Sequence, residues 1–279
     1  MSPRTRLLLE RFHVCPLLFR ERMGPTVDKK QARPVYKYVF TCPGKAEILV
    51  KSIKGVGHFN LRVSKGGQGV VQRAYNAFAV RVKLASGSES TPVSPRDAGA
   101  GDEGGPPGSG ARGERQVVPA NETTEGILCI EMRIRHYHDG AMSQLLEKLA
   151  NDPDNPAVQL QGPFLIDRVI PPPAHRNVVM IAAGTGINPM VQLIRDYQAR
   201  NRRAASQASK SRLALLWQCT SEGDFYCTDE LTAMQALSNG LLEVTALISG
   251  EHRKRNVPGA AFKRAKAGLM VRGKTCLML

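Results

Sequence analysis

The stretch Asn177-Val-Val-Met-Ile-Ala-Ala-Gly-Thr-Gly-Ile-Asn-Pro-Met190 decides how this chain is interpreted. Its first half is apolar and rich in β-branched residues, which predicts a buried strand. The strand ends at Gly184-Thr-Gly186, and Pro189 stands where a helix over residues 189–200 would begin. A glycine turn between a strand and a helix brings free backbone N–H groups and the positive end of the helix dipole together. The turn therefore suits an anion such as a dinucleotide pyrophosphate.

The signals beyond this turn continue to alternate between strand and helix. Strand 213–219 leads to helix 228–238, which Thr228 is placed to cap, and strand 242–248 follows. This βαβαβ order predicts a parallel sheet with ligands at the carboxyl ends of its strands. The glycine turn lacks the third glycine of a full Gly-x-Gly-x-x-Gly fingerprint, because Pro189 takes that place. An ordinary strand-to-helix turn that needs glycine for its backbone angles remains an alternative.

The region before residue 170 shows another pattern, in which short β-prone runs are broken by glycine. Regular short strands with turn signals between them predict an antiparallel barrel or sandwich. Gly66-Gly67 stands between two of these runs, as a hairpin turn would. The runs expected to form strands cover residues 36–41, 46–50, 58–63, 77–82 and 127–135.

Residues 85–126 interrupt this region with Ser, Gly, Pro and charged residues and almost no apolar ones. Such a segment buries too little surface to offset the entropy of ordering, so we predict a disordered insertion between two strands. After strand 127–135, the turn Gly140–Ser143 leads to a helix whose apolar positions begin at Met142. Pro171-Pro-Pro173 is typical of a stiff linker between two domains.

Composition and charge narrow the class of protein. The 279 residues give room for two domains, and 42% apolar with 23% charged residues is typical of globular proteins. No apolar run reaches the ~18–20 residues that span a bilayer. The six cysteines show no Cys-x-x-Cys spacing, and His136 and His138 have no evident third ligand. We therefore expect free thiols in a reducing compartment, with no metal site.

The net charge of +15 would attract an acidic protein, an anionic lipid surface or nucleic acid. Aromatic residues make up only 5% and do not alternate with the basic clusters, which argues against a stacking platform for single strands. Residues 4–22 are rich in Arg and Leu, as a mitochondrial transit peptide would be, but Glu10 and Glu21 favour a first strand with its lead-in. We expect a cytoplasmic location, with the mitochondrion and a membrane surface as alternatives.

Three motifs follow one another in this chain: Arg73-Ala-Tyr-Asn76, then Arg135-His-Tyr137 with Gly140-Ala-Met-Ser143, then the turn at residues 184–190. This order resembles the ferredoxin–NADP reductase superfamily, and most closely the NADH–cytochrome b5 reductases. The resemblance extends from about residue 12 to about residue 248 and includes three further segments. They are Gly57-His58, Gly162-Pro163-Phe164 and Thr220-Ser-Glu-Gly-Asp224 with Asp229-Glu-Leu231.

The resemblance implies two domains and two cofactors. An FAD-binding antiparallel β-barrel would cover residues 12–170, and an NAD(P)H-binding α/β domain would cover residues 174–279. The catalytic residues it implies are Tyr75, Asn76 and Asn188. The cofactor-binding residues it implies are Arg73, Tyr75, Asn76, Arg135, Tyr137, Gly140, Ala141, Met142, Ser143, Gly184, Thr185, Gly186, Pro189, Thr220 and Asp224.

The residue types suit these roles. A guanidinium such as Arg73 and a helix N-terminus such as Gly140–Ser143 both bind pyrophosphate, and Tyr75 could cover an isoalloxazine ring. Each residue also has an ordinary alternative, with Arg73 a surface cation, Tyr75 a packing residue and Ser143 a helix cap.

The chain departs from the family pattern at several places. Asn76 and Asn188 stand where the family has Ser or Thr, and two further departures are Ala79 for Ser and Leu165 for the second glycine of Gly-Pro-x-Gly. The family's late Cys-Gly-Pro motif is missing, and Cys276 is a poor substitute for its cysteine. We therefore expect the α/β domain to be incomplete, with its sheet lacking its last strand or two and exposing an edge.

The function that the resemblance implies is an FAD-dependent NAD(P)H oxidoreductase. Electrons would pass from the nicotinamide through FAD to a haem protein such as a cytochrome-b5 domain, and the basic charge suits an acidic partner. No Arg follows strand 213–219 closely enough to hold a 2′-phosphate, which favours NADH over NADPH. The alternatives are a degenerate reductase that binds the cofactors with little turnover, and a basic binding module. Peripheral membrane contact and the oligomeric state are left open.

Overall fold

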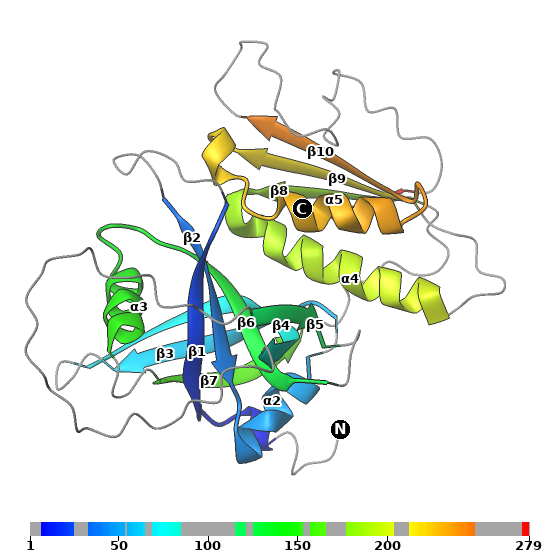
Figure 1. Ribbon diagram of the computed structural model, residues 1–279. Coiled ribbons are helices and arrows are strands. Elements are labelled where there is room, and N and C mark those ends of the chain that lie inside the picture. Colours follow the sequence, from blue (N-terminus) through cyan, green and yellow to red (C-terminus); the bar gives the residue numbers. More distant parts are fainter. Residues whose placement is uncertain are drawn as a thin grey trace, which may run out of the picture.

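Two sheets make up the fold in the computed structural model of this chain (Figure 1). One has seven antiparallel strands, and the other has four parallel strands with two helices packed beside it. The expected pairing of an antiparallel β domain with a parallel α/β domain is therefore confirmed. The structure describes residues 7–24, 33–53, 55–64, 69–84, 115–120, 125–152, 157–165, 177–203, 212–248 and 275–278.

The antiparallel sheet closes on itself. Its strand order is β3-β7-β1-β2-β6-β4-β5, and β3 also pairs with β4, so that β5 alone lies outside the ring. The strands are β1 (His13–Met23), β2 (Val35–Thr41), β3 (Gly57–Ser64), β4 (Val70–Leu84), β5 (Arg115–Pro119), β6 (Ile127–Arg135) and β7 (Ala157–Leu165). The helices of this part are α2 (Glu47–Lys51) and α3 (Ala141–Asn151), with a 3-10 turn η1 (Gly44–Ala46) before α2.

The parallel sheet has the order β10-β9-β8-β11. Its strands are β8 (Asn177–Ala183), β9 (Arg212–Cys219), β10 (Leu242–Ile248) and β11 (Thr275–Met278). Its helices are α4 (Ile187–Arg203) and α5 (Thr228–Leu237), with 3-10 turns η2 (Gly184–Gly186) and η3 (Glu222–Asp224). In Figure 1, both helices lie on the side of the parallel sheet that faces the antiparallel ring.

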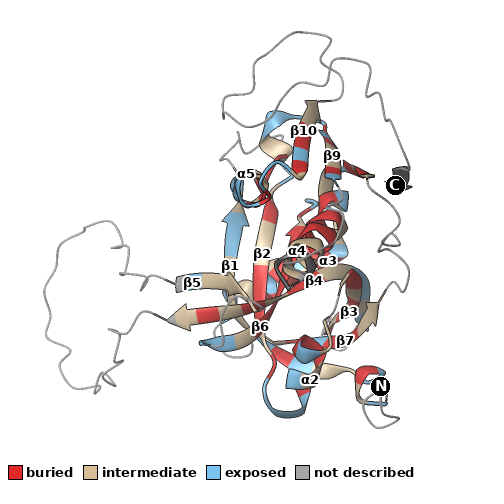
Figure 2. Ribbon diagram, turned by 90° about the vertical axis from the view of Figure 1, so that its right-hand side faces the viewer, coloured by how far each residue is buried: buried red, intermediate tan, exposed pale blue. Residues whose placement is uncertain are grey.

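The two sheets share apolar packing across their contact. Figure 2 shows buried residues along strands of both sheets and on α4 between them. One apolar cluster joins Phe78 and Val80 of β4 to Val191 and Ile194 of α4. A second cluster fills the inside of the antiparallel ring. The surface between the two parts is thus built as a core, which fixes their relative placement.

Strand β6 divides its residues between these two environments. Ile130, Met132 and Ile134 pack inside the antiparallel ring. Residues 131, 133 and 135 point to the other face, because side chains alternate along a strand. These three are Glu131, Arg133 and Arg135, so β6 presents a charged stripe to the second part of the molecule.

Two expectations for the first region were wrong. Residues 46–50 were expected to form a strand, but residues 47–51 form α2, which buries Leu49 and Val50. A short apolar run does not distinguish a strand from a helix, and Glu47 and Lys51 support the helix with an ion pair of 3.0 Å. Residues 115–119 were assigned to the disordered insertion, but they form β5, which pairs with β4.

One expectation for the second region was also wrong. Thr228 is the first residue of α5 and does not cap it, since Cys227 holds the N-cap position without a side-chain hydrogen bond. That the sheet lacks its last strand or two stays a prediction; among the described residues β11 pairs with β8, where Cys276 lies opposite Val178. That pairing covers only the first half of β8, so Cys276 lies at the far end of the strand from the Gly184 turn.

Several sequence features lie outside the described residues. These are residues 85–114 and 121–124 of the insertion, the turn Gly66-Gly67 and the linker Pro171–Pro173. Within the described part of the chain, none of the helices has the length and apolar character needed to cross a bilayer.

Candidate functional site

Three sequence motifs meet at one pocket of about 390 Å³. The pocket lies where β4, the end of β6, the start of α3 and the start of α4 come together. Thirteen residues line it, and eleven of them belong to the predicted site. The lining residues are Arg73, Ala74, Tyr75, Asn76, Arg133, Arg135, Tyr137, Gly140, Ala141, Met142, Ser143, Thr185 and Asn188.

The guanidinium of Arg135 lines this pocket, and only part of it is paired with other groups of the protein. Its Nη1 lies 2.9 Å from Oδ1 of Asp224, in η3 of the second part. Its Nε and Nη2 are buried and have no hydrogen-bond partner among the described residues. Buried donors are normally satisfied, because an unmade hydrogen bond costs about 1–3 kcal/mol. The guanidinium is thus prepared to donate to a group that enters the pocket.

The N-terminus of α3 offers further donors. Gly140 holds the N-cap position and provides no side-chain cap. Ser143 accepts a hydrogen bond of 3.0 Å from the N–H of Tyr137, so it closes the turn before the helix. A Cβ at Gly140 would lie 3.1 Å from Oγ of Ser143 and 3.2 Å from Tyr137, which leaves little room for a side chain. The first N–H groups of α3 are therefore available to an anion.

Arg73 and Tyr75 form the β4 wall of the pocket. Arg73 is exposed, and its Nη1 donates to the carbonyl of Gln72 at 2.8 Å. Burial raises the pKa of Tyr75 to about 12, against the lowering influence of Arg73. The phenol is thus neutral at physiological pH and can offer both its ring face and its O–H.

Asn188 has a structural role that its sequence position did not suggest. It is only 4% exposed. Its Nδ2 donates to the carbonyl of Arg133 at 3.3 Å, and its Oδ1 accepts from the hydroxyl of Tyr226 at 2.8 Å. Burial raises the pKa of Tyr226 well above its usual range, so that hydroxyl keeps its proton. Asn188 thus connects α4 to β6 and to the segment before α5.

The glycine turn after β8 stands beside Arg135. Gly184 has φ of +50°, a conformation that favours glycine, and its carbonyl accepts a hydrogen bond of 2.9 Å from Nε1 of Trp217. A Cβ there would lie 3.9 Å from the Arg135 guanidinium. The position of Gly186 has open space around it. Thr185 alone of the turn residues lines the pocket.

The remaining predicted site residues do not line the 390 Å³ pocket. Pro189 is in the first turn of α4 and does not line the pocket. Thr220 is exposed directly after β9. Asp224 uses one carboxylate oxygen for Arg135 and the other for the N–H and Oγ of Ser221, at 3.1 and 2.9 Å. Its carboxylate therefore holds η3 and Arg135 in place.

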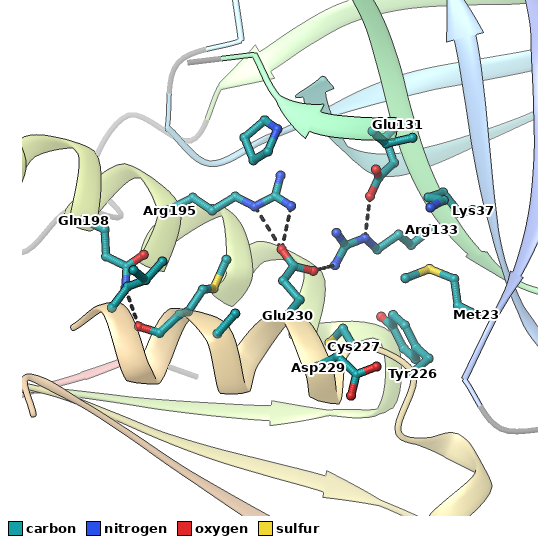
Figure 3. A pocket seen from close by; sticks show the side chains of 15 residues that line it. Met23, Lys37, Glu131, Arg133, Arg195, Gln198, Tyr226, Cys227, Asp229 and Glu230 are labelled. Carbon is teal, nitrogen blue, oxygen red and sulfur yellow. Dashed lines mark hydrogen bonds and ion pairs between the residues drawn. The ribbon is translucent and has the colours of Figure 1, made fainter. Parts of the chain in front are cut away.

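A network of buried ion pairs lies behind the pocket, and sequence reasoning missed it (Figure 3). Arg133 donates from Nε to Glu131 at 2.7 Å, and its Nη1 lies 2.6 Å from Glu230 of α5. Arg195 of α4 donates from Nε to the same Glu230 at 3.0 Å. Both guanidinium groups also stack on Phe78, at 4.3 and 4.8 Å from its ring centroid. The network connects the charged stripe of β6 to both helices of the second part.

The charges in this network stabilise one another. Burial alone would lower the pKa of Arg133, but the carboxylates of Glu131 and Glu230 outweigh burial and raise it. Burial would raise the pKa of Glu230, but Arg133 and Arg195 hold it below its usual value. A second pocket of about 440 Å³ opens beside these side chains, and Figure 3 shows how they line it. Charged residues at every second position of a strand, 131, 133 and 135, were the sequence signal that could have revealed this network.

Comparisons with known proteins agree with this geometry. Residues 180–261 match a family model described as an oxidoreductase NAD-binding domain. NADH-cytochrome b5 reductase 1 of Cryptococcus neoformans is 29% identical over 119 residues, which cover 43% of this chain and 37% of that relative. The predicted resemblance to NADH–cytochrome b5 reductases is confirmed. This reductase-like chain thus spans less than two thirds of the length of the curated relative that it matches.

Solved structures show the same two-part fold. The cytochrome b5 reductase domain of Ulva prolifera nitrate reductase has a TM-score of 0.55 at 16% identity, covering 99% of this chain and 87% of that chain. Flavohemoglobin of Malassezia yamatoensis, whose crystal structure has bound FAD and heme, has a TM-score of 0.57 at 13% identity. That match covers 95% of this chain and 52% of the flavohemoglobin. The reductase-like chain therefore has the fold of the ferredoxin–NADP reductase superfamily.

Proposed function

We propose that this chain is an FAD-dependent NAD(P)H oxidoreductase that passes electrons from a nicotinamide cofactor through FAD to a haem protein such as a cytochrome-b5 domain. In this proposal the antiparallel ring binds FAD and the parallel sheet binds the nicotinamide nucleotide. The observation that carries the proposal is the pocket that gathers Arg73, Tyr75, Arg135 and the start of α3. The two buried, unpartnered nitrogens of Arg135 are the specific reason to expect an electron-rich ligand there.

The residues present fit a flavin dinucleotide. A pyrophosphate or a ring carbonyl accepts hydrogen bonds, and the pocket has donors for it in Arg73, Arg135 and the first N–H groups of α3. Tyr75 supplies a neutral aromatic face in the same pocket. FAD, when bound, would supply the chemistry that accepts a hydride and passes electrons on singly.

The chain's own contribution is to hold two cofactors in alignment. The turn at Gly184–Gly186 would bind the nicotinamide nucleotide at the amino end of α4, where Ala183 gives the 3-10 turn η2 no side-chain cap. Arg135 and Asp224 tie this turn's neighbourhood to β6, so that the nucleotide turn and the flavin pocket are held together. Hydride transfer needs such alignment more than it needs an acid or a base.

An absorbance experiment tests the proposal. We expect the purified chain, loaded with FAD and desalted, to keep a visible flavin spectrum. Anaerobic NADH should bleach that spectrum and should do so at lower concentration than NADPH. A desalted sample without flavin absorbance would contradict the proposal. Reduction of a cytochrome-b5 domain, slowed by added salt because the chain carries a charge of +15, would support the acceptor.

A second candidate is a protein that binds the same cofactors with little turnover. Asn188 favours it, because each polar atom of this predicted catalytic side chain already has one partner within the protein. Rapid reduction of ferricyanide by NADH would exclude this candidate. Retained flavin with only slow bleaching would favour it over the first.

A further inference from the structure

Gln192 of α4 reaches from the second part of the molecule into the antiparallel ring. It is 4% exposed, and its side chain makes four hydrogen bonds there. Its Nε2 donates to the carbonyl of Gly57 at 3.2 Å and to the carbonyl of Ala77 at 2.6 Å. Its Oε1 accepts from the N–H of Gly57 at 3.4 Å and from Nδ2 of Asn76 at 3.2 Å.

These partners determine which way the Gln192 amide points. The carbonyls of Gly57 and Ala77 can only accept, so the NH₂ group of Gln192 must face them. Its oxygen must therefore face the other two partners, both of which donate. Reversing the amide would place an oxygen against two carbonyl oxygens in a buried position, which is costly.

The orientation of the Asn76 amide is determined in the same way. Its Nδ2 donates to the carbonyl of Gly57 at 3.1 Å as well as to Oε1 of Gln192. Both N–H bonds of Asn76 are thus used inside the protein. Asn76 also lines the 390 Å³ pocket beside Tyr75, and its Oδ1 is the polar atom that remains for that pocket.

We propose that Gln192 is a positioning residue for the flavin pocket, holding Asn76 so that this one side chain offers the pocket a hydrogen-bond acceptor and no donor. The inference rests on the proposed FAD site. Asn76 has no N–H bond left for the flavin, because both are used within the protein.

The proposal has a consequence for redox chemistry. Two-electron reduction of an isoalloxazine ring, with uptake of two protons, turns ring nitrogens that accept hydrogen bonds into N–H donors. A side chain that only accepts therefore favours the reduced ring over the oxidised ring. Tighter binding of the reduced form raises the two-electron midpoint potential of the bound flavin.

A matched pair of variants tests this. Gln192→Met removes the amide at nearly constant volume and lets the Asn76 amide turn. Gln198→Met makes the same change six residues further along α4, where Nε2 donates to the carbonyl of Met234 at 2.8 Å, away from the flavin pocket. We expect Gln192→Met to lower the preference for reduced over oxidised FAD about tenfold, which is about 30 mV in midpoint potential. Gln198→Met should leave the potential unchanged.

The potential is measured by anaerobic titration of the FAD-loaded protein with dithionite beside a reference dye. A potential that does not move in Gln192→Met, or that moves equally in both variants, would overturn the proposal. Asn76→Leu removes the acceptor while it leaves the bonds of Gln192 to Gly57 and Ala77. It should lower the potential in the same direction, even if Gln192→Met does not fold.

Nuclear magnetic resonance of the flavin-free protein separates this inference from the proposed function. The side-chain NH₂ of Asn76 should exchange slowly with solvent in the unmodified chain and in Gln198→Met, and quickly in Gln192→Met. Slow exchange in all three would contradict the role of Gln192. Failure of the chain to keep FAD would contradict the proposed function alone, since the exchange result would still stand.

Discussion

Arg133 and Arg135 stand two residues apart on one face of β6, yet their surroundings are opposite. Arg133 is held between Glu131 and Glu230, with Phe78 under its guanidinium. Arg135 has one carboxylate, that of Asp224, and two buried nitrogens with no partner among the described residues. A buried charge held between two carboxylates belongs to the architecture, whereas a guanidinium that lines a pocket with two unpartnered nitrogens indicates a ligand site.

The paired arginine is tested by removing its partner on α5. Glu230→Gln leaves Arg133 and Arg195 without the carboxylate that they share, in a place where Arg133 is 3% exposed. We expect the free energy of unfolding to fall by about 3 kcal/mol, because an uncompensated buried charge is costly. Chemical denaturation measures it. Glu21→Gln, which removes the exposed partner of Lys37, should cost only about 0.5 kcal/mol. Equal losses would mean that the network contributes no more than a surface pair.

The partly paired arginine is tested by ligand binding. Arg135→Met should weaken FAD binding about 30-fold, since hydrogen bonds from a charged donor contribute about 2 kcal/mol. The free energy of unfolding should also fall, by about 1–2 kcal/mol, because Asp224 loses its ion-pair partner and keeps only its hydrogen bonds to Ser221. Fluorescence titration of FAD measures the affinity. The control is Arg62→Met, which removes a guanidinium stacked on Phe12 outside the pocket. Similar losses of affinity in both variants would contradict the role of Arg135.

His136 follows Arg135 in the chain, and its protonation should make the free energy of unfolding depend on pH. Burial lowers the pKa of His136 to about 4, with Arg20 adding to the shift and Glu147 opposing it, and the ring pairs with the hydroxyl of Tyr38 at 2.6 Å. The unfolded chain takes up the proton near pH 6.5. The contribution of the neutral His136 to the free energy of unfolding is therefore fully present above pH 6.5, and it is lost as the pH falls from there towards 4.

We expect this loss to be about 1 kcal/mol after allowance for solvent screening. Unfolding free energies at pH 7 and pH 4.5 measure it, and His136→Gln should show a smaller difference between the two. His138→Gln changes a fully exposed ring and should keep the difference of the unmodified chain. The same pH dependence in all three proteins would contradict the assignment to His136.

The strands and the pocket could be predicted from the sequence to a large extent, because their signals are local. The bounds of β6, β8 and β10 agree with the apolar runs, and the motifs around Arg73, Gly140 and Thr185 line one pocket. Residues 46–50 could not be assigned, because a short apolar run fits a helix as well as a strand.

The links between the two parts could not be predicted, because they join residues far apart in the chain. In the sequence, Gln192 looks like an ordinary polar residue of a helix. Its partners at Gly57 and Asn76 are more than a hundred residues away in the chain. Glu230 is likewise about a hundred residues from Arg133, with which it pairs. The locations of Asn76 and Asn188 could be predicted, but the direction of each amide could not, because it depends on distant partners.

The hydrogen bond from Trp217 to the carbonyl of Gly184 gives the protein an optical probe of its own. The chain contains a single tryptophan, so its ultraviolet emission reports on one place. That place is the buried side of the turn proposed to hold the nicotinamide nucleotide. Any rearrangement of the turn would change the indole's environment, and a yellow chromophore in the neighbouring pocket would quench its light by energy transfer.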